Sequence, residues 1–382
     1  MGNVTDQAMI AALALAGLAA VSLLLFVWPY LVYPRLLAML PGKPLSRRPE
    51  ERSISLLFCA FNESRSLPGK LDNLRMLKAR HPDLEILAFD DGSTDGSAQM
   101  LAAETDLLTL VQGGGRSGKA AGMKQLAARA RGEILVFTDA NVLLAPDALD
   151  RLEPYYADEA IGGVCGTLRY GEGDSVTAEV GAEYWDLDEK LRSLESASGN
   201  VIGADGSIFS IRRALYPDFP DTVLDDFTVS MHAIFGGKRL VKAPDVIAFE
   251  NSVAQRGEEF RRKIRIGARA WHTHTFLRPK LQAMSRLDRF KYISRKMLRW
   301  FGGVFLMLAA LFGLAALAVL SVPAALAAAL LLAASVALLL RSSSGRLARI
   351  GEILVAVFGT QIGVMRAMRG ETFVTWAPAA SR

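Results

Sequence analysis

The sequence predicts an α/β domain with a mostly parallel β-sheet, joined to α-helical segments that cross a membrane. Short apolar runs alternate with helical periodicity between about residues 50 and 140, which is typical of a parallel sheet covered by helices. Long uncharged runs flank that region on both sides, and 51% of the 382 residues are hydrophobic. Together these observations predict one catalytic or binding domain held at a membrane.

The elements of the expected sheet follow in order along the chain. Strands are predicted at 53–59, 85–89, 107–111 and 133–138, and helices at 67–78 and 118–130. In such sheets, ligands bind beyond the carboxyl ends of the strands. Polar residues follow three of these strands, namely Phe61-Asn62-Glu63, Asp90-Asp91 and Asp139-Ala140-Asn141. Because carboxylates that converge at one edge repel one another, a divalent metal ion is expected there.

Two uncharged stretches, 8–34 and 300–340, are long enough to cross a bilayer, since a spanning helix needs about 20 apolar residues. The second stretch predicts two crossings with a break at Ser321-Val322-Pro323. A shorter apolar stretch at 350–365 is predicted to span as well. A cleaved signal peptide is disfavoured for the first stretch, because the residues before it include Asp6 and no Lys or Arg.

Basic residues predict the topology. Clusters at 35–52, 295–299 and 341–349 flank the uncharged stretches, and the positive-inside rule places them all on the cytoplasmic side. The N-terminus is then outside, in a multi-pass protein of a bacterial-type inner membrane. The net charge of +5 is assigned to anionic lipid headgroups rather than nucleic acid, because the cations cluster beside membrane segments. Residues 286–299 in particular are expected to lie on the membrane surface.

Two cysteines, Cys59 and Cys165, each lie within an apolar run, so buried free thiols are expected. Asp90 and Asp91 end the second strand, and the Ser93–Gly96 segment after them has ordinary turn chemistry. Ordinary turn chemistry does not explain two adjacent acids. A functional role for Asp90 and Asp91 is therefore as well supported as a purely structural one.

The segment 113–119 is rich in glycine and basic, but Ala120 after Lys119 rules out a GxxxxGK[ST] phosphate loop. As a flexible loop at a helix start, it can still present Lys119 or Arg116 to a phosphate. Asp139 and Asn141, two residues apart after a strand, can face one metal ion; the alternative is a helix cap.

Asp225 and Asp226 precede an apolar-periodic helix and could simply complement its dipole. In the functional alternative, one of them is a general base. Residues 258–269 predict a basic helix interleaved with apolar side chains, which in the plain interpretation lies on the membrane surface.

Taken in order, these motifs resemble the membrane-bound family 2 glycosyltransferases, the group of cellulose, hyaluronan and poly-N-acetylglucosamine synthases. The likeness covers about residues 50–275, and the closing Phe373-Val374-Thr375-Trp376-Ala377-Pro378 fits it too. The resemblance implies a GT-A-like, Rossmann-related domain. The chain is expected to divide into an N-terminal anchor (1–49), this catalytic domain (50–254), amphipathic interfacial helices (255–299) and two to three C-terminal spans (300–382).

The resemblance also implies roles for individual residues. By this resemblance, the residues expected to bind a nucleotide-sugar donor are Ala60, Asn62, Glu63, Asp90, Asp91, Lys119, Asp139 and Arg265. Asp139 and Asn141 are expected to bind a divalent metal ion, Mg²⁺ or Mn²⁺, and Asp205, Gly206 and Trp271 are expected to bind the acceptor. Catalysis falls on Asp225 and Asp226, with Asp226 as the general base.

Three positions depart from the family's pattern. Asn141 replaces an acid, so a metal ion there loses one charge. Asp225 replaces Glu, and the Gln and Trp of the family's Gln-x-x-Arg-Trp motif are missing around Arg265, although Trp271 lies near. Loss of that tryptophan favours simple transfer over processive synthesis.

The expected function is inverting, metal-dependent transfer of a sugar, first of all from a UDP-sugar, to a lipid-linked or glycan acceptor in exopolysaccharide or cell-envelope synthesis. A polyprenyl-phosphate acceptor would share the same chemistry. Two alternatives stay open: a processive polysaccharide synthase, and an inactive scaffold or regulator of another synthase. The expected partners are donor, acceptor, membrane lipids and other polysaccharide-assembly subunits.

Overall fold

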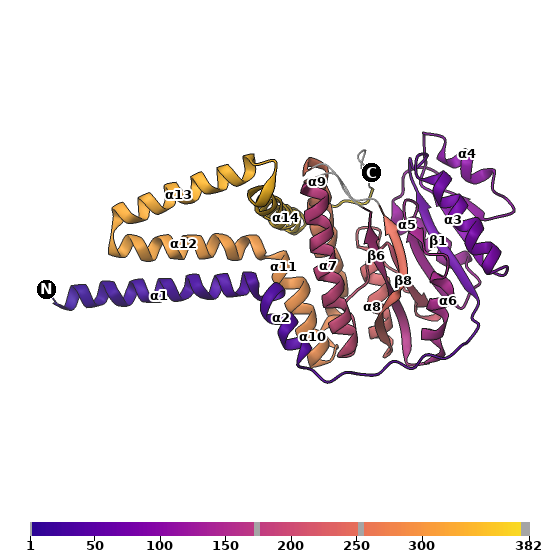
Figure 1. The fold of residues 1–382 in the computed structure, drawn as a ribbon, viewed down its shortest axis with the longest axis horizontal. Coiled ribbons are helices and arrows are strands. Elements are labelled where there is room, and N and C mark those ends of the chain that lie inside the picture. Colours follow the sequence, from indigo (N-terminus) through magenta and orange to yellow (C-terminus); the bar gives the residue numbers. More distant parts are fainter. Residues whose placement is uncertain (1, 172–175, 251–255, 376–382) are drawn as a thin grey trace.

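The computed structural model describes residues 2–171, 176–250 and 256–375. An α/β domain occupies one end of the molecule, and long apolar helices extend away from it on one side (Figure 1). A layer of helices that contains α7, α9, α10 and α11 lies between the two parts (Figure 1). The predicted combination of an α/β domain with separate apolar helices is confirmed.

The domain is built on one eight-stranded sheet in the order β3-β2-β1-β4-β7-β6-β8-β5. The strands are β1 (Ile54–Ala60), β2 (Glu85–Asp90), β3 (Thr109–Gln112), β4 (Ile134–Asp139), β5 (Leu143–Leu144), β6 (Ile161–Tyr170), β7 (Ile208–Arg212) and β8 (Arg239–Glu250). Strands β1 to β4 pair in parallel, as the sequence predicts, whereas β7 is antiparallel to β4 and β6. The register places Ala60 opposite Asp90 and Cys59 opposite Asp139, so these strands end at one edge.

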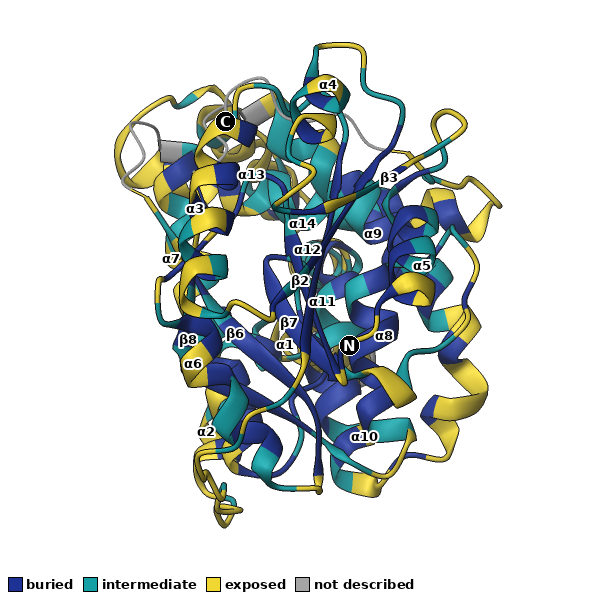
Figure 2. Cartoon of the chain, turned by 90° about the vertical axis from the view of Figure 1, so that its right-hand side faces the viewer, coloured by how far each residue is buried: buried dark blue, intermediate teal, exposed yellow. Residues whose placement is uncertain are grey.

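Helices cover both faces of this sheet, because the side chains of each central strand alternate between two apolar clusters. Leu56 and Phe58 of β1 face the cluster under α3 (Leu67–Arg80), α4 (Ser97–Ala102) and α6 (Ala148–Leu152). Leu57 and Cys59 face the cluster under α5 (Lys119–Arg129) and α8 (Asp225–Phe235). Figure 2 shows the sheet as a buried layer between these helices. Cys59 and Cys165 are buried free thiols, as predicted.

Three helices and two helical turns form the layer between the sheet and the apolar helices. They are α7 (Val176–Ala197), α9 (Arg256–Gln282), α10 (Arg286–Tyr292), a π-helical turn (Ile293–Met297) and α11 (Leu298–Trp300). The apolar side chains of α9, α10 and α11 meet those of α8 in a third cluster, which contains Phe227, Leu277, Tyr292 and Trp300. The α8 helix therefore packs against the sheet on one side and against this layer on the other.

Four segments of the described chain are long and apolar enough to cross a membrane. They are α1 (Gly2–Val27), which continues through a π-helical turn (Trp28–Val32) into α2 (Tyr33–Ala38), and α12 (Gly302–Leu320), α13 (Val322–Arg341) and α14 (Gly345–Met368). The predicted break between α12 and α13 is confirmed at Ser321, whose hydroxyl caps α13 by accepting from the N–H of Ala324. The N-terminus and this break lie at the end farthest from the domain (Figure 1).

The last of these helices, α14, runs in a different direction from the others. It is seen nearly end-on in Figure 1, whereas α1, α12 and α13 run across the view. Protein buries 44% of its apolar window, against none for α13. Gly267 of α9 and Gly359 and Gly363 of α14 allow this close packing, because a side chain at any of them would press on the other helix. A membrane-spanning role for α14 stays a prediction.

The expectation that residues 286–299 place their cations against lipid headgroups is wrong for the last part of that stretch. Arg295 is 1% exposed and donates to Asp188 and Glu195 of α7, at 2.9 and 2.7 Å. Arg299 donates to Asp188 at 2.6 Å. The physical reason is that α7 presents carboxylates to this stretch, and a guanidinium group is buried only when such partners accept its hydrogen bonds.

This buried charge network extends in two directions. Tyr33 of α2 donates to Glu195 at 2.5 Å, which ties the end of the N-terminal helix to α7. On the other side, Arg192 of α7 pairs with Asp188 and with Asp205. We call these residues the α7 seam: Tyr33, Asp188, Arg192, Glu195, Asp205, Arg295 and Arg299.

Candidate active site

The ends of β1, β2 and β4, with the loops that follow them, form one edge of the sheet, called here the carboxyl edge. The start of α5, the loop before β7 and the start of α8 meet at this edge. Lys119 at the start of α5 lies with its Nζ 2.5 Å from Asp139 Oδ1 and 3.8 Å from Asp225 Oδ2. Three predicted site residues thus come together from separate elements.

Gly206 places the fourth segment in the same cluster. A Cβ built on this glycine would lie 2.8 Å from Lys119 Nζ and 3.7 Å from a carboxylate oxygen of both Asp139 and Asp226. A side chain at position 206 would therefore meet the charged groups directly. Gly203 serves the same loop, since its φ of +79° favours glycine and a Cβ there would collide with the Phe227 ring.

Burial and mutual charge set the protonation of this cluster. The carboxylates of Asp139, Asp225 and Asp226 raise the pKa of Lys119 against the effect of its burial, so this lysine stays charged. Burial and the neighbouring Asp225 raise the pKa of Asp226 to about 6, although Lys119 opposes that shift. Asp226 is thus the carboxyl group of the cluster that exchanges its proton near neutral pH.

Asp90 and Asp91 have different surroundings. Asp91 is fully buried, and its oxygens accept from the N–H groups of Ser117 and Gly118, at 2.6 and 3.0 Å. Asp91 thus fixes the glycine-rich loop in place. Asp90 uses Oδ2 to accept from the N–H groups of Gly92 and Ser93, while its buried Oδ1 has no hydrogen-bond partner among the described residues.

The turn after β1 is tied to the loop after β2. Asn62 has a φ of +53° and accepts from the N–H of Thr94 at 2.8 Å, while its own N–H donates to Ser93. The N–H of Glu63 donates to Ser97 at 2.8 Å. Ala60 is the last residue of β1 and is fully buried. These three predicted residues therefore lie beside Asp90 at the carboxyl edge.

A cation lies over an aromatic ring among the same loops of the carboxyl edge. The Arg116 guanidinium group lies 3.3 Å from the centre of the Phe61 ring, which brings the glycine-rich loop over the turn after β1. The backbone of Val374, near the end of the described chain, packs against Gly118. The remainder of the closing motif, Trp376-Ala377-Pro378, lies outside the described residues.

Asn141 has a partner that the sequence does not suggest. Its Nδ2 donates to Glu250 Oε1 at 2.9 Å, and Glu250 is the last residue of β8. Lys70 of α3 lies beneath the same turn and donates to the carbonyl of Val142 at 2.6 Å. Burial lowers the pKa of Lys70 to about 7, although the nearby Asp139 opposes that shift. Both contacts hold the turn that carries Asp139 and Asn141.

On α9, Arg269, one turn beyond the predicted Arg265, reaches Asp225. Arg269 is buried, donates to the carbonyl of Val223, and lies with Nη2 3.8 Å from Asp225 Oδ1. Arg265 is half-buried on the same helix. The ring of Trp271 packs edge-on against Phe301, with 6.1 Å between ring centres, so it contributes to the packing of α9.

Arg269, Glu250, Lys70 and Arg192 are the residues that the sequence reasoning missed. For Arg269 a signal existed, because it lies four residues after Arg265 and therefore on the same face of the helix. The predicted Asp205 accepts from Arg192 of α7 and from the N–H of Ser207, so it fixes the loop that carries Gly206.

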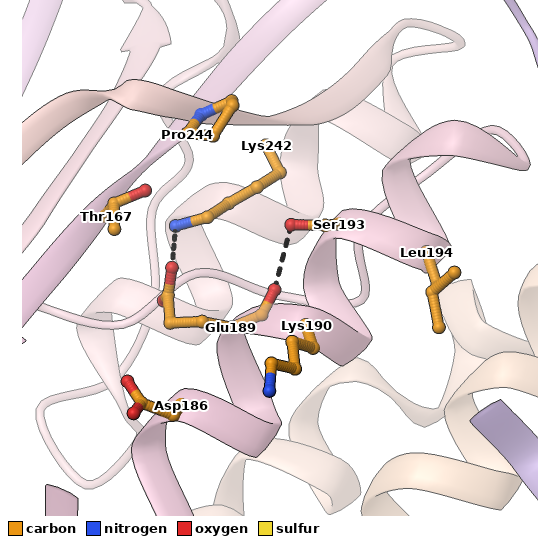
Figure 3. Close-up of a pocket in the computed structure, with 8 residues that line it drawn as sticks. All are labelled: Thr167, Asp186, Glu189, Lys190, Ser193, Leu194, Lys242 and Pro244. Atoms are coloured by element: carbon orange, nitrogen blue, oxygen red, sulfur yellow. Dashed lines mark hydrogen bonds and ion pairs between the residues drawn. The ribbon is translucent and has the colours of Figure 1, made fainter.

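A separate hollow of about 770 Å³ lies between α7 and strands β6 and β8 (Figure 3). Its lining residues are Thr167, Asp186, Glu189, Lys190, Ser193, Leu194, Lys242 and Pro244. Glu189 and Lys242 form an ion pair inside it, and Ser193 donates to the carbonyl of Glu189 (Figure 3). No predicted site residue lines this hollow, so it is distinct from the carboxyl edge.

Residues 55–219 match the family model described as Glycosyl transferase family 2. Poly-beta-1,6-N-acetyl-D-glucosamine synthase of Staphylococcus aureus is 25% identical over 215 residues, which are 53% of this chain and 50% of that protein. An uncharacterized glycosyltransferase of Nostoc sp. is 27% identical over 154 residues, which are 39% of this chain and 47% of that protein. The chain spans about half the length of the curated relatives it matches.

Among solved structures, a mannosyltransferase from Pyrobaculum calidifontis in complex with GDP-Man and Mn²⁺ has a similar fold. The TM-score is 0.70 at 24% identity, and the match covers 92% of this chain and 99% of that chain. The similarity therefore includes apolar helices as well as the α/β domain. The acids of α8 and the whole of α9 lie beyond the residues that the family model matches. Residues 55–219 of the chain thus carry a glycosyl transferase family 2 domain, and the domain has the GT-A fold.

Proposed function

We propose that this chain transfers a sugar from a nucleotide-diphosphate donor to a lipid-linked or glycan acceptor, with inversion at the anomeric carbon and with a divalent metal ion. The observation that carries the proposal is the convergence of Lys119, Asp139 and Asp226 around Gly206. A cation for a leaving diphosphate, an acid for a metal ion and a base for an incoming hydroxyl group are then close together.

The residues at the turn after β4 fit a hard divalent cation. Asp139 offers carboxylate oxygens, and Asn141 offers an amide oxygen because its NH₂ group is turned to Glu250. Within the described residues no group of three His, Cys, Asp or Glu side chains could hold a metal ion. Mg²⁺ and Mn²⁺ sites of this kind take one or two protein oxygens and complete their shell with substrate phosphates and water. A bound ion would supply positive charge to the departing diphosphate.

The chain's own groups perform the remaining chemistry. Lys119 stays charged and stabilises the same leaving group, while Arg269 and Lys119 together balance Asp225. That balance leaves Asp226 as the acid that takes the proton from the acceptor hydroxyl group. Its raised pKa of about 6 keeps it ionised at neutral pH and makes it a stronger base than an ordinary carboxylate. A positioned base of this kind contributes about 10²–10⁴-fold to the rate.

The donor's nucleoside is assigned to the turn and loop that flank Asp90. The buried Oδ1 of Asp90, without a partner among the described residues, is suited to accept from an N–H group of a nucleobase. The sequence resemblance favours a UDP-sugar, whereas the mannosyltransferase of similar fold was solved with GDP-Man. Both bases carry such an N–H group, so both donor classes belong in the test.

The helices α1, α12 and α13 are assigned as spans of a bacterial-type inner membrane, with α14 lying beside α9. The N-terminus and the α12–α13 break are then outside, and the carboxyl edge is cytoplasmic. Arg35 lies in α2, which follows α1 at the domain end of that helix, and Arg341 is the last residue of α13, whose first residues follow the break far from the domain. This arrangement agrees with the positive-inside rule. An acceptor held in the membrane by its lipid would present its sugar or phosphate close to α8 and α9.

Processive polysaccharide synthesis is the second candidate, and the match to a poly-beta-1,6-N-acetyl-D-glucosamine synthase favours it. The absence of the tryptophan of the family's Gln-x-x-Arg-Trp motif around Arg265 favours simple transfer, as the sequence resemblance implies. The length of the product separates the two candidates directly.

The test is the release of nucleoside diphosphate from a panel of UDP- and GDP-sugars by the detergent-purified chain, with membrane lipid extract as acceptor and with or without Mg²⁺ or Mn²⁺. We expect metal-dependent release from one donor, and its loss in Asp139→Ala. Chromatography of the product then gives its length and its lipid or glycan nature. Absence of release from every donor would contradict the proposal and favour a scaffold role.

A further inference from the structure

The contact between Asn141 and Glu250 explains why an amide stands where the related motif has an acid. Asn141 Nδ2 lies 2.9 Å from Glu250 Oε1. An aspartate at position 141 would bring two carboxylates into hydrogen-bond contact, which is unfavourable for like charges. An asparagine removes the repulsion and adds a donor. The Asn141 amide therefore complements the Glu250 carboxylate and is not a sign that the motif has lost its function.

Glu250 is held firmly enough to orient that amide. Its residue is 8% exposed, and its carbonyl accepts from the N–H of Gly171 at 3.0 Å. It lies opposite Tyr170 in the pairing of β6 with β8. Arg262 of α9 is close enough for Glu250 to raise the pKa of that arginine, so a cation balances the carboxylate. The carboxylate is thus fixed by backbone pairing and charge, from a strand other than β4.

The direction of this hydrogen bond decides what the amide can do. A carboxylate only accepts, so the NH₂ group of Asn141 must face Glu250. The amide oxygen, which is the atom that ligates hard cations, is then turned away from Glu250. It remains available on the same turn as Asp139. Partners that fix the orientation of a metal ligand typically contribute 10–100-fold to metal affinity.

We propose that Glu250 is a positioning residue that orients the Asn141 amide oxygen toward the metal ion held with Asp139, and that Asn141 and Glu250 together replace the second acid of the motif. This inference rests on the proposed metal-dependent function. It assigns no ligand role to Glu250 itself. The negative charge that position 141 lacks is retained at position 250, one hydrogen bond away from the turn.

The test is a double-mutant cycle on the full-length chain in detergent, with Glu250→Gln, Asn141→Asp and the double variant. Mn²⁺ affinity is measured by electron paramagnetic resonance of free Mn²⁺ in the presence of UDP or GDP, and thermal unfolding is followed without metal. Glu85→Gln is the matched control. Glu85 also accepts hydrogen bonds, from Ser55 and Arg131, but it is the first residue of β2 and therefore lies at the end of the strand away from the carboxyl edge. The control should lose stability without losing Mn²⁺ affinity.

We expect Glu250→Gln to bind Mn²⁺ about tenfold or more weakly. The double variant exchanges the amide and the carboxylate and keeps one hydrogen bond, so its affinity should return to within about threefold of wild type. Asn141→Asp alone should unfold at a lower temperature without metal than the double variant does. Unchanged affinity in Glu250→Gln, beside a wild type that binds Mn²⁺, would overturn the inference and leave the proposed function standing.

Failure of the double variant to recover would show that the Glu250 carboxylate is needed at its own position, which also contradicts the inference. A wild type that binds no Mn²⁺ with either nucleotide would overturn the metal dependence in the proposed function, and this inference with it. The unfolding comparison without metal distinguishes these cases, because it reports on the Asn141–Glu250 pair alone.

Discussion

The carboxyl edge and the α7 seam are both rich in charge, but they are built in opposite ways. At the carboxyl edge, some paired residues are close in sequence: Lys119 and Asp139 are 20 positions apart, and Asn62 and Thr94 are 32 positions apart. In the α7 seam, the contacts that α7 makes with α2 and with the stretch around Arg295 join residues 100 to 162 positions apart, as in Glu195–Arg295 and Tyr33–Glu195. Short motifs can reveal the first region, whereas only the folded chain reveals the second.

The two regions also differ in exposure, and therefore in what their charges can do. The Lys119 and Asp139 side chains are 18% and 34% exposed, so a ligand can reach them. Arg295 and Glu195 are 1% and 0% exposed, so their charges interact with other buried groups of the protein rather than with a ligand. The comparison indicates that the carboxyl edge carries out the reaction. The α7 seam attaches the helical layer to the catalytic domain.

The largest effect on stability is expected in the α7 seam. Arg295→Met removes the guanidinium group shared by Asp188 and Glu195 and leaves buried carboxylates short of a partner. Breaking a buried ion pair in this way costs about 3–5 kcal/mol. Thermal unfolding in detergent should show a clear drop in the midpoint. The matched control, Arg286→Met on the exposed side of α10, should leave it nearly unchanged.

If Arg286→Met lowered the unfolding midpoint as much as Arg295→Met does, the buried ion pairs of the α7 seam would contribute no more to stability than an exposed arginine. That result would also remove the structural basis for separating the two regions.

An effect of intermediate size is expected from pH, which should change turnover at the carboxyl edge but not the ionisation of the α7 seam. Asp226 acts as a base only when it is ionised, so turnover should fall as pH drops below its pKa of about 6, by about tenfold per pH unit. Arg295, Arg192 and Arg299 hold the pKa of Asp188 well below its usual range, so that carboxylate stays ionised in the same window. Its contribution to stability is lost only at much lower pH.

Turnover and thermal unfolding measured from pH 8 to pH 5 give the comparison. We expect turnover to fall without a drop in the unfolding midpoint, because Asp188 stays ionised and because protonation of Asp226, whose pKa is raised on folding, favours the folded state. A turnover that stays flat down to pH 5 would remove Asp226 as the base.

The smallest effect is expected for an ion pair that belongs to neither region. Arg75 on α3 donates to Asp72 at 2.7 Å and to Glu104 at 2.6 Å, and its own side chain is half exposed. Such pairs contribute about 0.2–1 kcal/mol, because water competes for both partners. Arg75→Ala should therefore shift neither turnover nor the unfolding midpoint appreciably. A shift comparable to that of Arg295→Met would mean that burial does not rank the ion pairs of this chain.

Much of the fold could be predicted because it depends on local patterns. Strands β1 to β4, helices α3 and α5, and the break at Ser321 lie where apolar runs and turn residues place them. The meeting of Asp90, Asp139 and Lys119 at one edge follows from parallel pairing, which puts strand ends side by side. Here the local sequence and the tertiary structure agree.

The parts that could not be predicted depend on which distant surfaces face each other. Arg295 and Arg299 look like membrane-surface cations, since nothing in 286–299 reveals that α7 supplies carboxylates to them. Glu250 is separated from Asn141 by 109 positions, so the pairing that explains Asn141 is invisible in the motif. Arg269 lies one helical turn beyond Arg265, and only the packing of α9 on α8 reveals that Arg269 reaches Asp225.

The most direct test of the central claim compares donor binding and turnover in Asp226→Asn. The metal-dependent affinity for the nucleotide-sugar and the rate of transfer are measured on the same detergent-purified samples, beside wild type. We expect donor affinity within about threefold of wild type and a rate lower by about 10²–10⁴-fold. A variant that keeps more than a tenth of the wild-type rate would contradict the assignment of Asp226 as the base.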